Sequence, residues 1–229
     1  MIAAGPVFIL VPFILWRYRY KNKKARYTPN WEFSGLLDSI MWGVPIAIII
    51  VLSSQLWHST KTLDPYLPIE SDVPALQIQV VGLDWKWLFI YPEYGVATVG
   101  ELAFPVDRPV SMVLTSDTVM QSFLISALAG QIYVMPGMQT KLHVKADAPG
   151  IFEGENTQFN GVGFPKQKFK AVAVTSKEFD QWVMKVRAEG VALSETTYKF
   201  IANRSTAEEV YDALGSSVMP ENITYFNKV

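Results

Sequence analysis

A stretch in the second half of the chain has the composition of a ligand-binding loop but lacks the side chains that bind metals. It reads GENTQFNGVGFPKQKFKAVAV and covers residues 154–174. Its Gly and Asn residues are typical of a tight turn that leads into a strand. The stretch contains no Cys, His or Met, which are the soft donors that copper prefers. The loop therefore predicts a shaped geometry without metal-ligand chemistry.

The other reactive side chains do not form a catalytic set. The chain has no Cys and two His residues, His58 and His143. His143 falls on the polar phase of a predicted strand, where we expect a solvated imidazole, because a metal site needs several converging donors. The sequence contains no Ser-His-Asp order, no P-loop and no dinucleotide fingerprint. We therefore expect no catalytic residue in this chain taken alone.

Two uncharged apolar runs lie near the start of the chain, at residues 1–16 and 39–57. With a rise of about 1.5 Å per residue, the second run can cross a hydrocarbon core of about 30 Å. The first run covers only about 24 Å, so we expect its outer end to be missing from this chain. A signal peptide is the alternative, but its basic residues would precede the apolar run, whereas here they follow it. Both runs therefore predict membrane spans.

A basic cluster separates the two runs and predicts their orientation. Its members are Arg17, Arg19, Lys21, Lys23, Lys24 and Arg26. Basic residues in short connections stay on the cytoplasmic side. We therefore expect a transmembrane hairpin at 1–57, with spans at about 1–16 and 36–57, a cytoplasmic loop at 17–33 and both chain ends outside. The formal net charge of −1 gives no support for nucleic-acid binding.

The composition changes twice after the hairpin. Residues 58–74 are rich in Pro, Ser, Thr and Asp and predict an extended linker. Residues 75–175 contain short runs rich in Val, Ile, Phe, Tyr and Trp, which predict an antiparallel β-sandwich. Within it Leu76, Ile78 and Val80 alternate with polar residues, as half-buried strands do.

Residues 176–229 change to a helical pattern and predict a helical C-terminal extension. Four apolar residues share one face of its first helix: Phe179, Trp182, Val183 and Val186. Ser176 is a candidate N-cap and Gly190 a candidate stop. We expect this extension to pack on the sandwich or on a partner.

Several motifs occur in one order along the chain: RYTPNW and WGVP in the hairpin, then LDWKWLFIYPEYGVATVGELAFPVDRPV, TSDTVMQSF, GMQTKLHV and GENTQFNGVGF. In this order they resemble subunit II of the heme-copper terminal oxidases, most closely the ubiquinol oxidase branch of cytochrome bo type. The resemblance covers the chain from the first span to about residue 185. It implies two transmembrane helices in a bacterial inner membrane, a periplasmic cupredoxin-like sandwich and both chain ends in the periplasm.

The resemblance also implies cofactors and partners. The hemes, a copper ion and the quinol pocket would belong to subunit I, with ubiquinol as the substrate of the complex. The implied partners are subunit I, small membrane subunits III and IV, and membrane lipid, whereas cytochrome c is not expected. We expect no cofactor in this chain.

In the cytochrome c oxidase branch, the loop that matches residues 154–174 carries a binuclear copper centre. The resemblance places Asn156 and Asn160 at two cysteine positions, Gln158 at a carbonyl donor, Phe164 at a histidine, Gln167 at a methionine, and Gln121 at an earlier histidine. Amide oxygens and a phenyl ring cannot replace thiolates, imidazoles and a thioether. We therefore expect a domain without copper that transfers no electrons, in an oxidase that draws them from quinol.

Two further sites follow from the same resemblance. Trp85 and Trp87 match an aromatic stretch that faces the electron donor in the cytochrome c branch, and with no copper we expect packing contacts instead. We expect both rings on one face of a strand and Lys86 on the other. Asp38, at the inner end of the second span, lies where the family has a glutamate near a proton path into subunit I. An ordinary first-turn Asp, favoured by the helix dipole, is the equal alternative.

The predicted fold is a membrane-anchored, mainly β protein: a two-helix hairpin, a cupredoxin-like sandwich and a short helical tail. The leading functional hypothesis is a non-redox subunit II of a proton-pumping ubiquinol oxidase in an aerobic respiratory chain. One alternative is a copper-binding subunit II of a cytochrome c oxidase, or a membrane-tethered electron carrier. Another is a membrane-anchored binding module unrelated to respiration.

Overall fold

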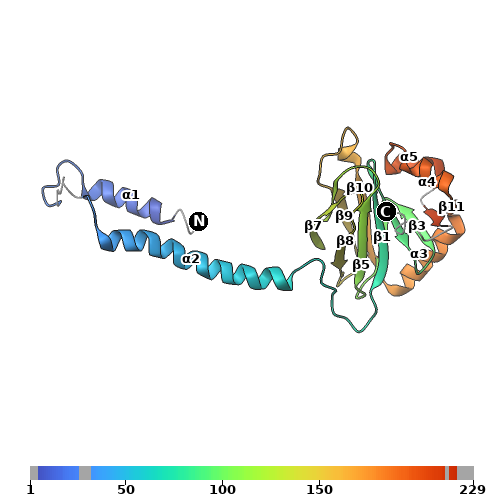
Figure 1. Ribbon diagram of the computed structural model, residues 1–229, viewed down its shortest axis with the longest axis horizontal. Coiled ribbons are helices and arrows are strands. Elements are labelled where there is room, and N and C mark those ends of the chain that lie inside the picture. Colours follow the sequence, from blue (N-terminus) through green and yellow to red (C-terminus); the bar gives the residue numbers. More distant parts are fainter. Residues whose placement is uncertain (1–4, 26–31, 215–216, 221–229) are drawn as a thin grey trace. The chain divides into compact units, whose positions relative to one another are not determined.

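The computed structural model describes residues 5–25, 32–214 and 217–220. The chain forms two compact units, residues 1–59 and residues 60–229 (Figure 1). The motif RYTPNW, which begins with Arg26 of the basic cluster, lies outside the described residues. The end of the C-terminal extension also lies outside them.

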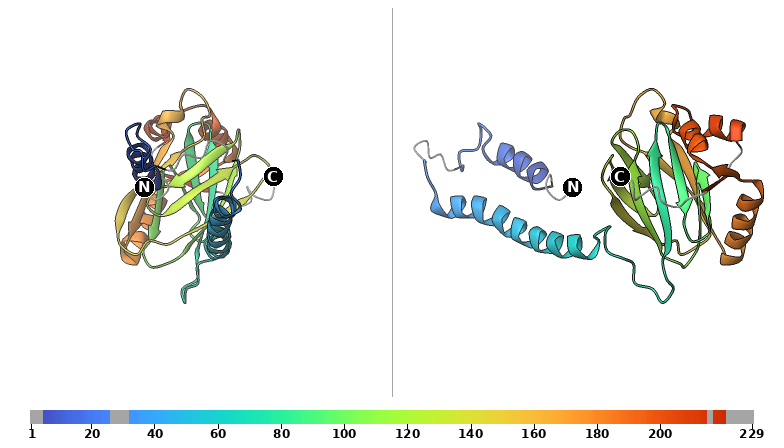
Figure 2. Two further views of the ribbon diagram at one scale, coloured as in Figure 1. Left: turned by 90° about the vertical axis from the view of Figure 1, so that its left-hand side faces the viewer. Right: turned by 45° about the vertical axis from the view of Figure 1, so that its right-hand side comes forward.

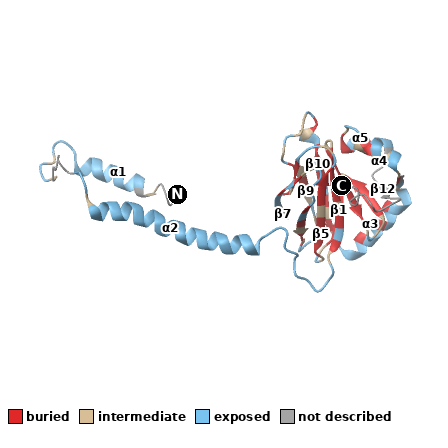
Figure 3. Cartoon of the chain, viewed as in Figure 1, coloured by how far each residue is buried: buried red, intermediate tan, exposed pale blue. Residues whose placement is uncertain are grey.

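The N-terminal unit consists of two apolar helices, α1 at Gly5–Arg17 and α2 at Gly35–Thr62. Figure 3 shows that both helices are exposed along their length, and α2 buries none of its residues. Of the described helices, α2 alone is long and apolar enough to cross a membrane. A long helix that exposes large apolar side chains on all sides needs a lipid or protein environment.

The boundaries of these helices differ from the predicted spans. Helix α2 continues to Thr62, beyond the predicted end at residue 57, so the predicted linker begins with helical residues. Pro45 lies inside α2, which a membrane helix tolerates. Ser34 precedes the helix, and its Oγ accepts a hydrogen bond from the backbone N–H of Leu37 at 3.4 Å. The helix therefore begins at a side-chain cap.

The C-terminal unit is a sandwich of two sheets, seen from three directions in Figures 1 and 2. The first sheet has the order β11-β12-β3-β2-β1-β5-β8 and the second has the order β4-β10-β9-β6-β7. The strands of the first sheet within the sandwich are β1 Leu76–Leu83, β2 Lys86–Tyr91, β3 Val96–Val99, β5 Val110–Ser116 and β8 Thr140–Val144. Those of the second are β4 Glu101–Pro105, β6 Gln121–Ile125, β7 Ala129–Val134, β9 Gly150–Asn156 and β10 Lys168–Val174.

The sequence predicted an antiparallel sandwich, but two of its strand pairs are parallel. Strand β1 pairs with β5 in parallel, and β10 pairs with β4 in parallel. Both pairs join segments that are distant in sequence. Gly100 separates β3 from β4 with a φ of 70°, a conformation that favours glycine, and there the chain passes from the first sheet to the second. The remaining pairs are antiparallel, apart from β11 with β12 in the extension.

An aromatic cluster fills the space between the sheets. Phe123 and Phe169 stack with their ring centroids 4.9 Å apart, and Trp87 meets Phe123 edge to face at 5.1 Å. The inward residues Leu76, Ile78 and Val80 are buried as the alternation predicted. This core fixes the strand ends at which the candidate site lies.

The C-terminal extension covers the outer face of the first sheet. It consists of α3 Ser176–Glu189, β11 Val191–Leu193, α4 Glu195–Ala202, α5 Ala207–Leu214 and β12 Ser217–Pro220. Leu193, Ile201 and Val210 form a second apolar cluster with Leu88 and Ile90 of β2. As a result, every residue of β2 is buried, because both faces of the strand are covered. The extension thus packs on the sandwich and adds two short strands to the predicted helices.

Helix α3 confirms the predicted apolar face and corrects the predicted cap. Phe179, Val183 and Val186 are buried. The N-cap is Thr175 rather than Ser176: its side chain accepts a hydrogen bond from the backbone N–H of Glu178, whose carboxylate accepts one in return from the Thr175 N–H. This reciprocal pair is a capping box, and the helix therefore begins at Ser176, the residue that the sequence suggested as the cap.

Candidate functional site

The candidate site forms where four strand ends meet at one end of the sandwich. Strand β1 ends at Leu83, β6 begins at Gln121, β9 ends at Asn156 and β10 begins at Lys168. The β9–β10 loop, residues 157–167, therefore lies beside the β1–β2 turn and the start of β6. The loop is the yellow-orange segment above the sheets in Figure 1.

Gln167 lies at the centre of a network of carboxamides. Its Oε1 atom accepts hydrogen bonds from Nδ2 of Asn156 at 3.0 Å and from Nδ2 of Asn160 at 2.7 Å. Its Nε2 atom donates to Oε1 of Gln121 at 2.5 Å and to the backbone oxygen of Leu83 at 3.4 Å. Four of the six residues that the family resemblance places at emptied copper-ligand positions are therefore in direct contact.

Three of the four carboxamide residues are buried, and Asn160 is half-buried. Gln121 and Gln167 are 0% exposed and Asn156 is 4% exposed. Nε2 of Gln121 also donates to the Leu83 oxygen at 3.1 Å. Because a buried carboxamide costs free energy unless its donors and acceptors are paired, this pairing is what stabilises polar groups here.

Asn156 connects the network to the backbone of the loop. Its Oδ1 atom accepts hydrogen bonds from the N–H of Ser122 at 2.9 Å and from the N–H of Gln158 at 3.0 Å. These two donors identify which atom of the side chain is the oxygen. Its Nδ2 atom also donates to the backbone oxygen of Gln158 at 2.8 Å. The main-chain carbonyl of Gln158, rather than its side chain, thus faces the network.

Two glycines leave the space that the site needs. A Cβ atom at Gly82 would lie 2.8 Å from Oε1 of Gln121, so the absence of a side chain admits that carboxamide. A Cβ atom at Gly163 would lie 2.0 Å from the indole ring of Trp85. The ring therefore packs directly on the loop backbone, and its Nε1 donates to the backbone oxygen of Asn160 at 3.3 Å.

The two tryptophans occupy different places. Trp87 lies in β2 and is buried in the core between the sheets. Trp85 does not lie in a strand, contrary to the expected alternation, but in the β1–β2 turn with a φ of 66°. Lys86 is on the opposite side of β2 from Trp87, as predicted, and there it is fully buried under the extension.

Phe164, the sixth ligand position, takes no part in the carboxamide network. Its ring lies 5.7 Å from the ring of Phe159, which is 72% exposed. Met120 and Met138 lie in neighbouring turns and are exposed. Phe164 thus contributes to an apolar surface beside the network.

The donor set at this site does not fit a copper centre. The converging groups are neutral carboxamides and backbone carbonyls, whereas a redox copper site requires thiolate, imidazole and thioether donors. In the described part of the chain, no group of three or more His, Asp or Glu residues is arranged to hold a metal ion. The carboxamides at the centre also hydrogen bond to one another, although Oδ1 of Asn160 is shielded from solvent and has no partner among the described residues.

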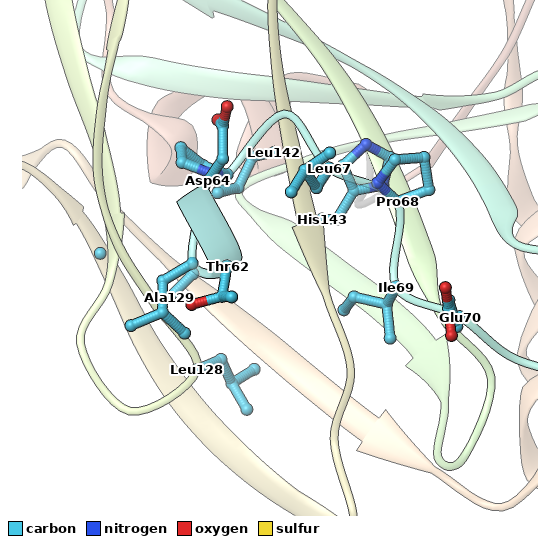
Figure 4. Close-up of a pocket in the computed structure, with 13 residues that line it drawn as sticks. Thr62, Asp64, Leu67, Pro68, Ile69, Glu70, Leu128, Ala129, Leu142 and His143 are labelled. Atoms are coloured by element: carbon cyan, nitrogen blue, oxygen red, sulfur yellow. The ribbon is translucent and has the colours of Figure 1, made fainter. Parts of the chain in front are cut away.

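His143 lies in a separate pocket of about 650 Å³ between the linker and strands β7 and β8 (Figure 4). Burial, with the nearby charge of Lys141, lowers the pKa of its imidazole below the usual value. Its Nδ1 atom is shielded from solvent and has no hydrogen-bond partner among the described residues. His143 is thus less solvated than expected. Asp64 and Glu70 line the same pocket, but the described residues include no group of three or more side chains arranged to hold a metal ion.

Asp38 belongs to the N-terminal unit. It lies in the first turn of α2 with its side chain exposed, and its backbone N–H donates to the oxygen of Ser34 at 3.0 Å. This position is favourable for a carboxylate because of the helix dipole.

Comparison with known proteins agrees with the fold and the motifs. Residues 96–176 match the family model described as cytochrome c oxidase subunit II, periplasmic domain. The cytochrome bo(3) ubiquinol oxidase subunit 2 of Pseudomonas putida is 47% identical over 94% of this chain and 68% of its own length. The same-named protein of Pseudomonas aeruginosa is 46% identical over 96% of this chain and 66% of its own length. The chain thus spans about two thirds of each of these relatives.

A solved structure with a similar sandwich is the periplasmic domain of subunit II of cytochrome oxidase from Bradyrhizobium japonicum, with a TM-score of 0.48 and 23% identity over 52% of this chain and 96% of that one. The ubiquinol oxidase relatives cover the hairpin and the extension as well as the sandwich. On their identity and coverage, this chain belongs to the subunit 2 family of the ubiquinol oxidases, a branch of the heme-copper oxidases, and is a membrane-anchored subunit of an oxidoreductase complex.

Proposed function

We propose that this chain is a non-redox subunit of a proton-pumping ubiquinol:oxygen oxidoreductase, in which it supports assembly and covers the outer face of the heme-bearing subunit I. The carboxamide network carries this proposal. It occupies the positions of copper ligands with groups that hold each other and that do not bind copper. This domain then has no cofactor that accepts electrons, and the electrons enter the complex from ubiquinol in the bilayer.

Copper analysis of the purified full-length complex tests this proposal. We expect that removal of this chain leaves the ratio of copper to heme unchanged, because the copper belongs to the heme-bearing subunit. A loss of stoichiometric copper with this chain would contradict the proposal and support the alternative of a copper-binding subunit II.

The surface around the network supports the assembly role. Five exposed apolar side chains extend from three loops at this end of the sandwich and form what we call the apolar rim: Val119, Met120, Met138, Phe159 and Val162. Phe159 is 72% exposed and Val162 is 93% exposed. Large apolar side chains that gather at a loop end are typical of a protein contact surface. We assign the rim to the contact with subunit I.

Charge placed on the rim tests this assignment. Phe159→Asp with Val162→Asp should reduce the amount of heme-bearing subunit that purifies with the chain, because a desolvated carboxylate opposes the contact. Ile151→Asp is the matched control, since Ile151 is 69% exposed at the other end of β9. Equal recovery of the heme-bearing subunit with both variants would refute the assignment.

The membrane topology is the second part of the proposal. The apolar helices α1 and α2, with the basic residues between them, support two spans, a cytoplasmic loop and both chain ends in the periplasm. The proposed partners within the membrane are subunit I, subunits III and IV, and lipid. The thiol of a Lys24→Cys variant should react with a membrane-impermeant reagent only from the cytoplasmic side. Reaction from the periplasm would contradict the proposed topology.

Asp38 is a candidate for proton entry to the complex. It lies in the first turn of α2, next to the proposed cytoplasmic loop, and its carboxylate is exposed on the helix. Carboxylates in membrane spans are costly unless they are paired or hydrated, and so they often mark proton paths. Asp38→Asn should slow oxygen reduction and proton uptake, whereas Glu32→Gln, just before the helix, should not. Unchanged turnover of Asp38→Asn over a pH series would leave the ordinary first-turn role.

A further inference from the structure

We propose that the C-terminal extension is a clamp that holds the β1–β2 turn and, through this turn, sets the conformation of the β9–β10 loop. Lys86 is the positioning residue of this clamp. The clamp holds the site in shape whether or not the domain binds a metal or a partner.

The ammonium group of Lys86 lies in a cradle built by the extension. Its Nζ atom donates to the backbone oxygen of Asn203 at 2.7 Å, and to the backbone oxygen and Oγ of Ser205, each at 2.9 Å. A fourth oxygen, the backbone carbonyl of Asp84, lies 3.2 Å away within the turn itself. Lys86 is 0% exposed, so these oxygens replace its hydration shell.

A second contact joins the same two segments. Nε of Arg204 lies 3.0 Å from Oδ2 of Asp84 in an ion pair. The Arg204 side chain is 78% exposed, so this pair alone contributes little. Arg204 lies between Asn203 and Ser205, the two cradle residues, so this ion pair joins the turn to the same connection.

The cradle itself is fixed by the second apolar cluster. Residues 203–206 connect α4 to α5, and each helix contributes a buried side chain near this connection: Ile201 from α4 and Val210 from α5. Because both flanking helices are packed, the three oxygens of the cradle have defined positions. A flexible tail could not supply them at a comparable entropic cost.

The turn that the cradle holds is in direct contact with the carboxamide network. The backbone oxygens of Leu83 and Lys86 lie 3.4 and 3.5 Å from Nε2 of Gln167. Between them, the Trp85 ring packs on Gly163 and hydrogen bonds to the Asn160 backbone. Displacement of this turn would therefore remove contacts with the loop at both of its ends.

Contact therefore runs without a break from the extension, through Lys86 and the turn, to the loop. The same loop carries Phe159 and Val162 of the apolar rim. If the rim contacts subunit I, the extension also sets the shape of that contact, and this last step rests on the proposed function.

The test is hydrogen exchange of the full-length chain in detergent, with Lys86→Met compared with wild type. Loss of three or four charge-assisted hydrogen bonds should raise amide exchange in residues 157–167 by about tenfold or more. Lys199→Met is the matched control, because Lys199 lies on α4 in an exposed ion pair with Glu195 at 2.9 Å. It should leave the loop at the wild-type rate.

A simple loss of stability would raise exchange throughout the sandwich, including β8 at the far edge of the first sheet. The clamp predicts faster exchange in residues 157–167 and 203–205 with β8 unchanged. Faster exchange confined to residues 203–205 would overturn the proposal. So would a uniform rise in every strand.

Ser205→Ala is the milder variant if Lys86→Met does not fold. It removes one acceptor of the Lys86 ammonium group, the Ser205 Oγ at 2.9 Å, and should raise loop exchange by a smaller factor, in the same direction. A rate in residues 157–167 equal to that of Lys199→Met would then contradict the clamp. Copurification of the heme-bearing subunit is measured separately, so a failed rim and a failed clamp give different results.

Discussion

At the scale of single residues, the site depends on the fact that a carboxamide both donates and accepts hydrogen bonds. Thiolates and imidazoles in a metal centre are held in place by the ion, whereas Gln121, Asn156, Asn160 and Gln167 hold one another. These mutual hydrogen bonds keep the shape of the loop without any ligand. They also explain why these polar side chains can be buried.

Removal of the central carboxamide should be costly. Gln167→Leu leaves the side chains of Asn156 and Asn160 without their common acceptor in a buried place, and we expect a loss of about 2–4 kcal/mol in the free energy of unfolding. Gln158→Ala is the control, because its contribution is the main-chain carbonyl. Denaturant unfolding of the full-length chain measures both. A loss for Gln167→Leu as small as the control's would contradict a stabilising network.

Lys86 should make stability depend on pH. Burial lowers its pKa to about 8, while Asp84 and Glu209 act in the opposite direction; the usual value is 10.5. Between these two pH values the unfolded chain holds the Lys86 proton more tightly than the folded chain does, so the free energy of unfolding rises with pH. Subtracting the curve of Lys86→Met from that of wild type should leave this rise, and a flat difference would contradict the shifted pKa.

At the scale of elements, the β1–β2 turn and the β9–β10 loop meet through a ring and a glycine. Gly163 has a φ of −83°, which any residue can adopt, so a substitution there tests the contact and not the backbone. Its place against Trp85 leaves no space for a Cβ atom.

Gly163→Ala should therefore displace the loop at a cost of about 1–3 kcal/mol in the free energy of unfolding. Combination with Trp85→Ala should recover part of this loss, because the smaller side chain admits the new methyl group. Gly130→Ala is the control, since a Cβ atom there meets nothing within 4 Å. Additive losses in the double variant would show that the ring and the glycine do not interact.

The cap of α3 is a second prediction at this scale. Thr175→Ala removes the capping box and should lower the free energy of unfolding by about 1 kcal/mol. Ser176→Ala, one residue later and already inside the helix, should have little effect. Thermal unfolding of the two variants decides between the caps, and a larger effect at Ser176 would restore the cap that the sequence suggested.

The comparison of sequence and structure differs between local and distant features. The alternation at Leu76–Val80 and the helical face at Phe179 depend on spacing along the chain, and the sequence predicts both correctly. The parallel pairs β1–β5 and β4–β10 join distant segments, and nothing in either segment specifies its partner. Lys86 was placed opposite Trp87 by alternation, but the oxygens that bury it lie 117 and 119 residues away.

The site shows the same division. The resemblance to a copper loop predicts six site residues, and the structure brings four of them into contact. The hydrogen bond that Gln167 donates to Gln121 and the position of Phe164 outside the network depend on side-chain directions. The spacing of residues along the chain does not specify these directions. Gly82 had a sequence signal, a glycine at the end of a strand, which indicates close approach of another group.

At the scale of the whole molecule, the chain joins a membrane anchor to a sandwich that holds its own site closed. The family relationship places it in an oxidoreductase complex. We propose that the sandwich conducts no electrons, because its loop offers carboxamides where copper needs sulfur and imidazole. In this proposal, the electrons of the complex come from a source in the bilayer.

Heme reduction in the purified complex tests this claim most directly. The visible spectrum is recorded anaerobically, first with a ubiquinol and then, in a separate sample, with reduced cytochrome c. The account predicts that ubiquinol reduces the hemes and that cytochrome c leaves them oxidised. Rapid heme reduction by cytochrome c that is lost when this chain is removed would contradict it.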